Sequence, residues 1–67
     1  MAKIQLNGKK LKIRMNLTIQ DLLKKHRLNE EKIAIELNGT ILPKHQYKKR
    51  KIKNNDKIEI VQFIGGG

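Results

Sequence analysis

Cysteine and tryptophan are absent from this chain of 67 residues, which also has one proline, one phenylalanine and one tyrosine. Without cysteine the chain cannot form disulfides, thiolate metal sites or a cysteine nucleophile. No apolar run is long enough to cross a membrane, and residues 1–11 lack the continuous apolar stretch of a signal peptide. We therefore expect a cytoplasmic protein with no membrane partner, or a protein of the plastid stroma if the source is a photosynthetic eukaryote.

Acidic residues are scarce as well. Six Asp and Glu stand against sixteen Lys and Arg, which gives a formal net charge of +10. Such a field attracts anionic partners, although a solvated lysine-rich surface without a binding role has the same composition. Because the chain has few aromatic residues, it lacks the platform on which single-stranded nucleic acids stack, and nucleic acid is not the expected partner. We expect electrostatic docking on an acidic protein face through the densest basic run: Lys48, Lys49, Arg50 and Lys51.

The small size of the chain argues against an independent enzyme. A domain this short has a thin core and little room for a ligand pocket, which usually measures about 300 Å³ or more. His26 and His45 are nineteen positions apart, with no cysteine or paired carboxylates beside them. We therefore expect no metal site, no bound cofactor and no catalytic side chain.

Alternating apolar residues and two Asn-Gly pairs predict the strands. Asn-Gly between alternating runs is a strong hairpin signal because both residues tolerate positive φ, and the pairs stand at 7–8 and 38–39. Pro43 ends the short strand after the second pair, since proline removes a donor from the ladder. The expected strands cover 3–7, 10–14, 32–37, 41–42 and 57–63.

One helix is expected after the first hairpin. Thr18 is a good N-cap, and Asp21 can return its hydrogen bond in a capping box. The apolar residues that follow Thr18 have the spacing of one helix face, and lysines stand at the end, where the helix dipole favours cations. This stripe consists of Ile19, Leu22 and Leu23.

These elements predict an α+β domain, with a mixed sheet of four to five strands and one main helix across one face. The first hairpin is antiparallel, and the last strand can pair parallel to the first in the centre, which is the β-grasp arrangement. Tyr47 and Ile52 are the expected anchors of the basic stretch 44–53. The expected core consists of Ile4, Leu6, Ile13, Ile19, Leu22, Leu23, Ile35, Leu37, Ile58 and Ile60.

Four segments carry a resemblance to a known family over nearly the whole chain: 4–9, 18–23, 33–43 and 56–67. They resemble the sulfur carrier proteins of thiamine (thiazole) biosynthesis, a ubiquitin-like β-grasp family. The last segment is the most specific, because it ends in three glycines. The basic charge is a departure from this family, whose surfaces are more balanced or acidic.

The resemblance implies a β-grasp domain over 1–64 and a flexible glycine tail over 65–67. It implies that an E1-like adenylating enzyme uses ATP to convert the carboxylate of Gly67 to an acyl-adenylate. A sulfur donor such as a cysteine desulfurase then makes a thiocarboxylate, which thiazole synthase consumes. Gly65 and Gly66 suit a thin tail that enters another protein's active site, since glycine has no Cβ.

The last strand also predicts a docking patch. By the period of two, Ile58 and Ile60 lie on one sheet face, and Val61 and Phe63 on the other. An exposed apolar pair beside a reactive tail is typical of a docking surface, whereas burial of Phe63 by its neighbours is the structural alternative. The expected partner-binding residues are Val61, Phe63 and Ile64.

Two other functions stay open at this stage. A carrier on the same fold could serve molybdopterin synthesis or tRNA thiolation, because a fold does not fix the pathway that consumes the sulfur. A small basic RNA-binding module belongs to a different class. It predicts salt-dependent RNA binding and no effect of deleting Gly66 and Gly67.

Overall fold

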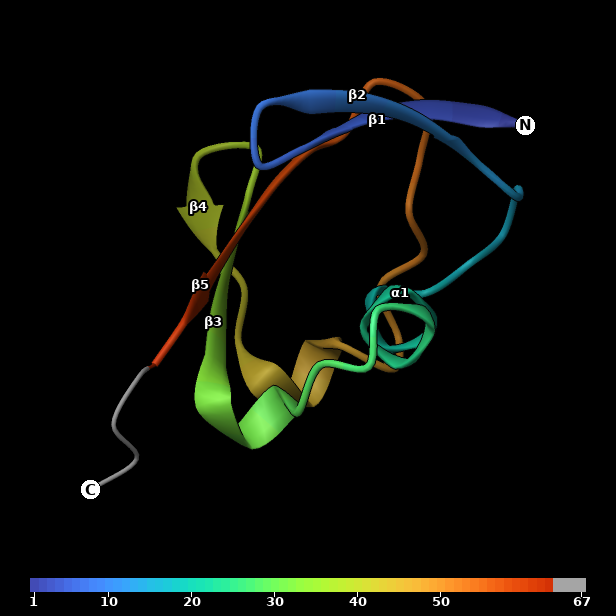
Figure 1. Cartoon of the computed structure of the whole chain (residues 1–67). Helices are drawn as coiled ribbons and strands as arrows, with labels where there is room; N and C mark the ends of the chain where they lie inside the picture. The colour runs from blue at the N-terminus through green and yellow to red at the C-terminus, as the bar shows by residue number, and fades with distance from the viewer. Residues whose placement is uncertain (64–67) are drawn as a thin grey trace.

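The computed structural model describes residues 1–63, which form a five-stranded mixed sheet with one helix across one face (Figure 1). The sheet order is β2-β1-β5-β3-β4, which confirms the expected α+β class and β-grasp arrangement. Ile64 and the glycine tail lie outside the described residues. The strands are β1 (Ala2–Leu6), β2 (Lys9–Ile13), β3 (Ile33–Leu37), β4 (Thr40–Ile41) and β5 (Lys57–Gln62). The helices are α1 (Ile19–Lys25) and the 3₁₀ turns η1 (Glu30–Lys32) and η2 (Lys44–Gln46).

The last strand occupies the centre of the sheet. β5 pairs parallel with β1 at two positions and antiparallel with β3 along five. β1 and β2 form an antiparallel hairpin, and β3 and β4 form a second one. The expected pairing is therefore confirmed, and every strand boundary lies within one residue of its expected place.

Both Asn-Gly pairs form the turns that the sequence predicts. Asn7 and Gly8 have φ of 48° and 82°, and Asn38 and Gly39 have φ of 52° and 86°. These left-handed values at both central residues match the twist of a tight hairpin. The two asparagine side chains also reach β5, where each accepts a backbone hydrogen bond.

Helix α1 begins as expected. Thr18 Oγ1 accepts a hydrogen bond from the Asp21 backbone N–H, and the Asp21 carboxylate accepts one from the Thr18 backbone N–H. The backbone hydrogen bond from Thr18 is the main cause that holds the pKa of Asp21 below its ordinary value. The capped helix then packs three buried side chains against the sheet: Ile19, Leu22 and Leu23.

The core differs from the expected one at four positions. Leu6 and Ile60 are half-buried, because Leu6 is the last residue of β1 and Ile60 lies beyond the point where β5 pairs with β1. Ala2 and Ile33 are buried, because each lies two positions before a core residue of the same strand, Ile4 and Ile35, and therefore on the same face. The expected anchors Tyr47 and Ile52 are confirmed, and both are buried.

A buried carboxylate fixes the long connection from β4 to β5. The carboxylate of Asp56 accepts hydrogen bonds from the Lys53 backbone N–H at 2.7 Å and from Asn38 Nδ2 at 3.0 Å. Arg50 Nη2 pairs with it at 3.2 Å. Burial alone would raise the pKa of Asp56, but these hydrogen bonds and the guanidinium outweigh it and hold the pKa below its ordinary value.

We predict that the core depends much more on Leu22 than on Ile60. Leu22 is completely buried, so Leu22→Ala should lower the free energy of unfolding by about 2–5 kcal/mol. Ile60→Ala is the matched control and should cost clearly less, because Ile60 is half-buried. Urea denaturation measures both, and equal losses in the two variants would contradict this description of the core.

We predict that Asp56 makes the fold sensitive to acid. Because its folded pKa is depressed, the carboxylate stabilises the fold above the unfolded pKa of about 3.9, and this contribution is lost as the pH falls through the folded pKa. Asp56→Asn should lower the free energy of unfolding by about 1–3 kcal/mol at neutral pH. It should also flatten the loss of stability below about pH 4.

Thermal denaturation across this pH range tests the prediction. Glu59→Gln is the control, because it removes one exposed carboxylate outside the Asp56 hydrogen bonds. Parallel stability curves for the parent and Asp56→Asn would refute the assignment.

Candidate functional site: the open sheet face and the end of β5

The face of the sheet opposite α1 carries the exposed apolar residues that the sequence predicts. Val61 lies opposite Ala34 in the pairing of β5 with β3, whereas Ile60 and Ile58 lie opposite core residues of β3. Val61 and Phe63 are 60% and 55% exposed. The structure therefore places both side chains in solvent, and their role in docking stays a prediction.

A third exposed apolar residue joins them on this face. Ile41 of β4 is 65% exposed and lies opposite Glu36 of β3, which itself lies opposite Glu59 of β5. Directly opposite residues point to the same face, so Ile41 shares the open face with Val61 and Phe63. Sequence reasoning missed Ile41 because its face depends on the register of a two-residue strand. We call Ile41, Val61 and Phe63 the apolar patch.

The contact between the last strand and β3 continues to Phe63, the last described residue. The backbone N–H of Phe63 donates to the Lys32 carbonyl at 2.8 Å, which continues the pairing of β5 along the start of β3. The apolar patch therefore lies immediately before the segment that carries the expected reactive terminus. Ile64, Gly65, Gly66 and Gly67 lie outside the described residues, and their expected roles stay predictions.

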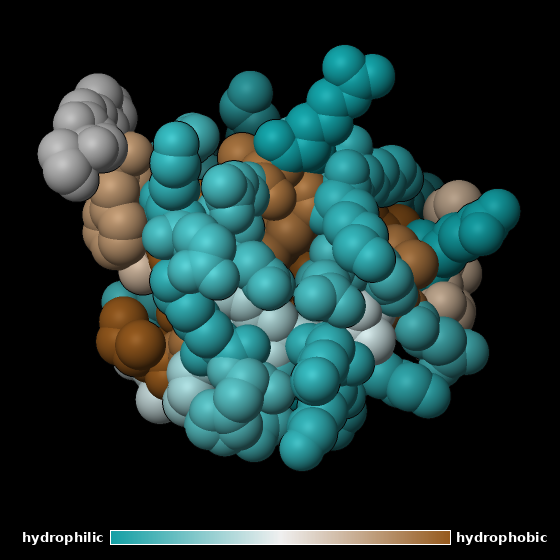
Figure 2. All heavy atoms as spheres, turned by 90° about the horizontal axis from the view of Figure 1, so that it is seen from below, coloured by the Kyte–Doolittle hydropathy of each residue, from teal (hydrophilic) through white to brown (hydrophobic). Residues whose placement is uncertain are grey.

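The basic run at 48–51 lies elsewhere. The Ile19 backbone N–H donates to the Arg50 carbonyl at 3.0 Å, and Lys51 forms a bridge with Thr18. The run thus lies beside the start of α1, on the helix side of the sheet, away from the apolar patch (Figure 1). Hydrophilic side chains dominate the end of the molecule that α1, η1 and η2 form (Figure 2).

The four residues of this run also differ from one another. Lys48, Lys49 and Lys51 are exposed, whereas Arg50 is partly buried and pairs with Asp56. Arg50 is therefore part of the fold, in addition to any contact that it makes outside. The run could not be placed from sequence because its position depends on the path of the connection around α1.

The ionisable side chains of the described residues form no metal-binding group. Within residues 1–63, no group of three His, Cys, Asp or Glu could hold a metal ion, and both histidines are exposed. Asp21 caps α1 and Asp56 fixes a loop, so the carboxylates with a lowered pKa have structural roles. In the same part of the chain, no helix is long and apolar enough to span a bilayer.

Comparisons with known proteins agree with this geometry. The family model described as the ThiS family matches residues 3–67. The chain is 42% identical over 65 residues to the sulfur carrier protein ThiS of Bacillus subtilis, and the match covers 96% of this chain and 98% of that protein. It is also 37% identical to part of a thiazole synthase of Paramagnetospirillum magneticum, where the match covers 97% of this chain and 20% of that protein.

A solved structure has the same fold. A crystal structure of a thiamine biosynthesis protein (ThiS) from Geobacter metallireducens superposes with a TM-score of 0.81 and 28% sequence identity, covering 97% of this chain and 99% of that chain. The family model, the full-length relative and the shared architecture all include the strand that leads to the terminal glycines. Because the family model, the full-length relative and the fold agree, the chain belongs to the ThiS family.

Proposed function

We propose that the protein is a sulfur carrier for thiazole formation in thiamine biosynthesis, and that its reactive group is the α-carboxylate of Gly67. The observation that carries the proposal is the similarity to a sulfur carrier over 96% of this chain, together with a family model that matches through residue 67. The described side chains fit a carrier better than a catalyst, because those with perturbed ionisation serve the fold.

The chemistry requires activation because a carboxylate anion resists nucleophilic attack. An E1-like adenylating enzyme joins the carboxylate to AMP from ATP and releases pyrophosphate, which creates a good leaving group on the carbonyl carbon. The persulfide of a donor of the cysteine desulfurase type then displaces AMP and forms an acyl disulfide. A thiol attacks the donor sulfur of this acyl disulfide, forms a new disulfide with the donor cysteine and releases the thiocarboxylate. The resulting thiocarboxylate is a soft nucleophile that passes the sulfur on. The carrier binds no cofactor in this scheme, since ATP is bound by the partner.

The fold contributes presentation and recognition. β5 lies at the centre of the sheet, and the backbone of Phe63, the last described residue, is hydrogen-bonded to Lys32 just before β3. Val61 and Phe63 are exposed and come shortly before the tail in the sequence, so an enzyme that encloses the tail also contacts them. Phe63 is thus proposed to anchor the complex while the glycines reach the active site.

Thiazole synthase is the proposed acceptor of the sulfur. The similarity to part of a protein named thiazole synthase supports this choice, because the matching segment is a small fraction of that chain and stands there beside other sequence. Carriers for molybdopterin or tRNA thiolation have no comparable observation in their favour. The cytoplasm is the proposed compartment, with the plastid stroma as its equivalent in a photosynthetic eukaryote.

We predict that amidation of the C-terminus abolishes activation. The amide replaces the carboxylate oxygen that attacks ATP and leaves the folded domain unchanged. ATP–pyrophosphate exchange by the cognate adenylating enzyme should therefore require the native chain. Equal exchange with native and amidated chains would exclude the terminus as the site. Binding of RNA that survives deletion of Gly66 and Gly67 would instead favour the RNA-binding alternative.

We predict that Phe63→Ser weakens the complex with the adenylating enzyme by about tenfold or more, because a central exposed aromatic residue often dominates an interface. The free energy of unfolding should change by less than about 0.5 kcal/mol, since the side chain is largely exposed. Met15→Ser is the matched control, because Met15 is similarly exposed but lies between β2 and α1. Calorimetric titration that gives the same Kd for both variants would exclude Phe63 as an anchor.

A further inference from the structure

Four lysines gather on the open face over β1, β2 and the start of β5. Lys3 of β1 lies directly opposite Lys12 of β2, and Gln5 lies opposite both Lys10 of β2 and Lys57 of β5. All four lysines are exposed. We call Lys3, Lys10, Lys12 and Lys57 the open-face lysines.

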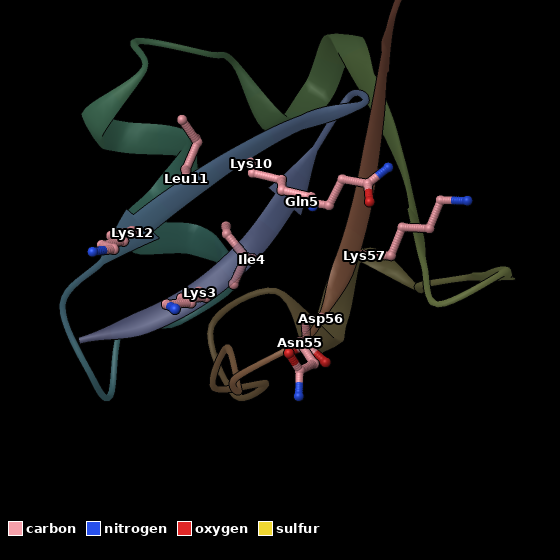
Figure 3. Close-up of a pocket in the computed structure, with 9 residues that line it drawn as sticks. All are labelled: Lys3, Ile4, Gln5, Lys10, Leu11, Lys12, Asn55, Asp56 and Lys57. Carbon is pink, nitrogen blue, oxygen red and sulfur yellow. The ribbon is translucent and has the colours of Figure 1, made fainter.

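These lysines surround a hollow. A depression of about 460 Å³ is lined by all four, together with Gln5, Asn55, Asp56 and neighbouring residues of β1 and β2. The charge of Asp56, the one acidic lining residue, is buried and paired with Arg50. Figure 3 shows the lining side chains coming from three adjacent segments: β1, β2 and the start of β5. The positive charge is therefore concentrated on one concave area.

Protection of a sheet edge does not account for this cluster. Lysines on an edge strand prevent edge-to-edge aggregation, and β2 is such a strand. Lys57, however, lies on the central strand, and Lys3 lies on an interior strand. Like charges directly opposite each other are also unfavourable, so Lys3 and Lys12 destabilise the hairpin that carries them. A binding surface for an anionic partner is expected to contain both lysines despite the repulsion between them.

The open side of β5 shows which kind of partner fits. Its alternate residues are Lys57, Glu59, Val61 and Phe63, which change from basic through acidic to apolar over about 20 Å. Glu36 stands directly opposite Glu59 and doubles the negative charge at the middle of this series. A polyanion that ran along the face from the lysines would meet these two carboxylates. A folded protein surface can place a different group against each zone.

We propose that the open-face lysines, and not the run at 48–51, bind an acidic surface on the E1-like adenylating enzyme that receives the tail. This inference rests on the proposed function. The partner then presents apolar groups near the entrance of its tail-binding channel, a basic group opposite Glu36 and Glu59, and carboxylates about 20 Å from the entrance. The two charged zones fix the orientation of the carrier, and the lysines raise the rate of encounter.

Two triple variants with the same net charge test the proposal. Each Lys→Glu change alters the charge by −2, so three changes take +10 to +4 in either variant. The first carries Lys10→Glu, Lys12→Glu and Lys57→Glu on the open face. The control carries Lys48→Glu, Lys49→Glu and Lys51→Glu on the helix side. The readout is ATP–pyrophosphate exchange by the cognate adenylating enzyme at low and high salt.

The open-face variant should raise the KM for the carrier by about tenfold or more at low salt, with little change in kcat. The control should change KM by less than about twofold, and high salt should reduce the difference. Equal effects of the two variants would show that net charge alone matters, and no effect of either would leave the cluster without this role. Both outcomes overturn the inference.

Three further measurements distinguish an acidic protein partner from nucleic acid, from a second copy of the chain and from simple loss of folding. Thermal denaturation checks folding, and a Lys→Gln version of the open-face variant keeps the test decisive if the Glu version unfolds. The first alternative is tested with a uridine oligonucleotide. If the parent binds it and the open-face variant does not, while ATP–pyrophosphate exchange by that variant is unchanged, the lysines bind nucleic acid and the proposal is refuted. Self-association of the parent that the open-face variant abolishes, again with unchanged exchange, would assign them to a second copy. Exchange with an amidated terminus would reject the proposed function itself, independently of the lysines.

Discussion

The structure depends on holding β5 in the middle of the sheet, and the two hairpin turns do this directly. Asn7 Oδ1 accepts from the Ile60 backbone N–H at 2.7 Å, and Asn38 Oδ1 accepts from the Lys57 backbone N–H at 2.8 Å. Both asparagines also have the positive φ that their turns require. Each residue therefore closes a hairpin and clamps the central strand, and glycine at the same place would provide only the turn. Asp56 completes the arrangement by tying the approach to β5 to Asn38.

This arrangement makes the open face a direct product of the alternation along β5. Once Ile58 points into the core, Lys57, Glu59, Val61 and Phe63 must all point the other way. β5 thus supplies a core residue on one face and charged and apolar residues on the other, and it precedes the C-terminal segment of the chain. Within residues 1–63 the one α-helix covers only the other face, so the small domain combines a buried side sufficient for folding with a sheet surface that stays exposed.

The sequence was informative wherever a local pattern determines the structure. The Asn-Gly turns, the capping box around Thr18 and the alternation of β5 are local, and the structure agrees with each. Properties that depend on register or chain path could not be read in the same way. Grouping Lys3 with Lys12 requires the pairing of two strands, and grouping either with Lys57 requires the parallel crossover. The basic run at 48–51 is evident in the sequence. The connection from β4 to β5, however, places it on the helix side of the sheet. Leu6 and Ile60 follow the core pattern but lie where two strands cease to pair.

The parallel contact between β1 and β5 joins two segments that are made at opposite ends of synthesis. Gln5 pairs with Lys57, so the central ladder cannot close until nearly the whole domain has left the ribosome. A chain interrupted before residue 57 lacks Ile58, a completely buried member of the core, and also lacks the strand that joins β1 to β3. Such a fragment cannot complete its core, and chains that do not fold are removed by proteases. Folding therefore acts as a test of completeness, because only a chain that has been translated past its central strand can close the sheet.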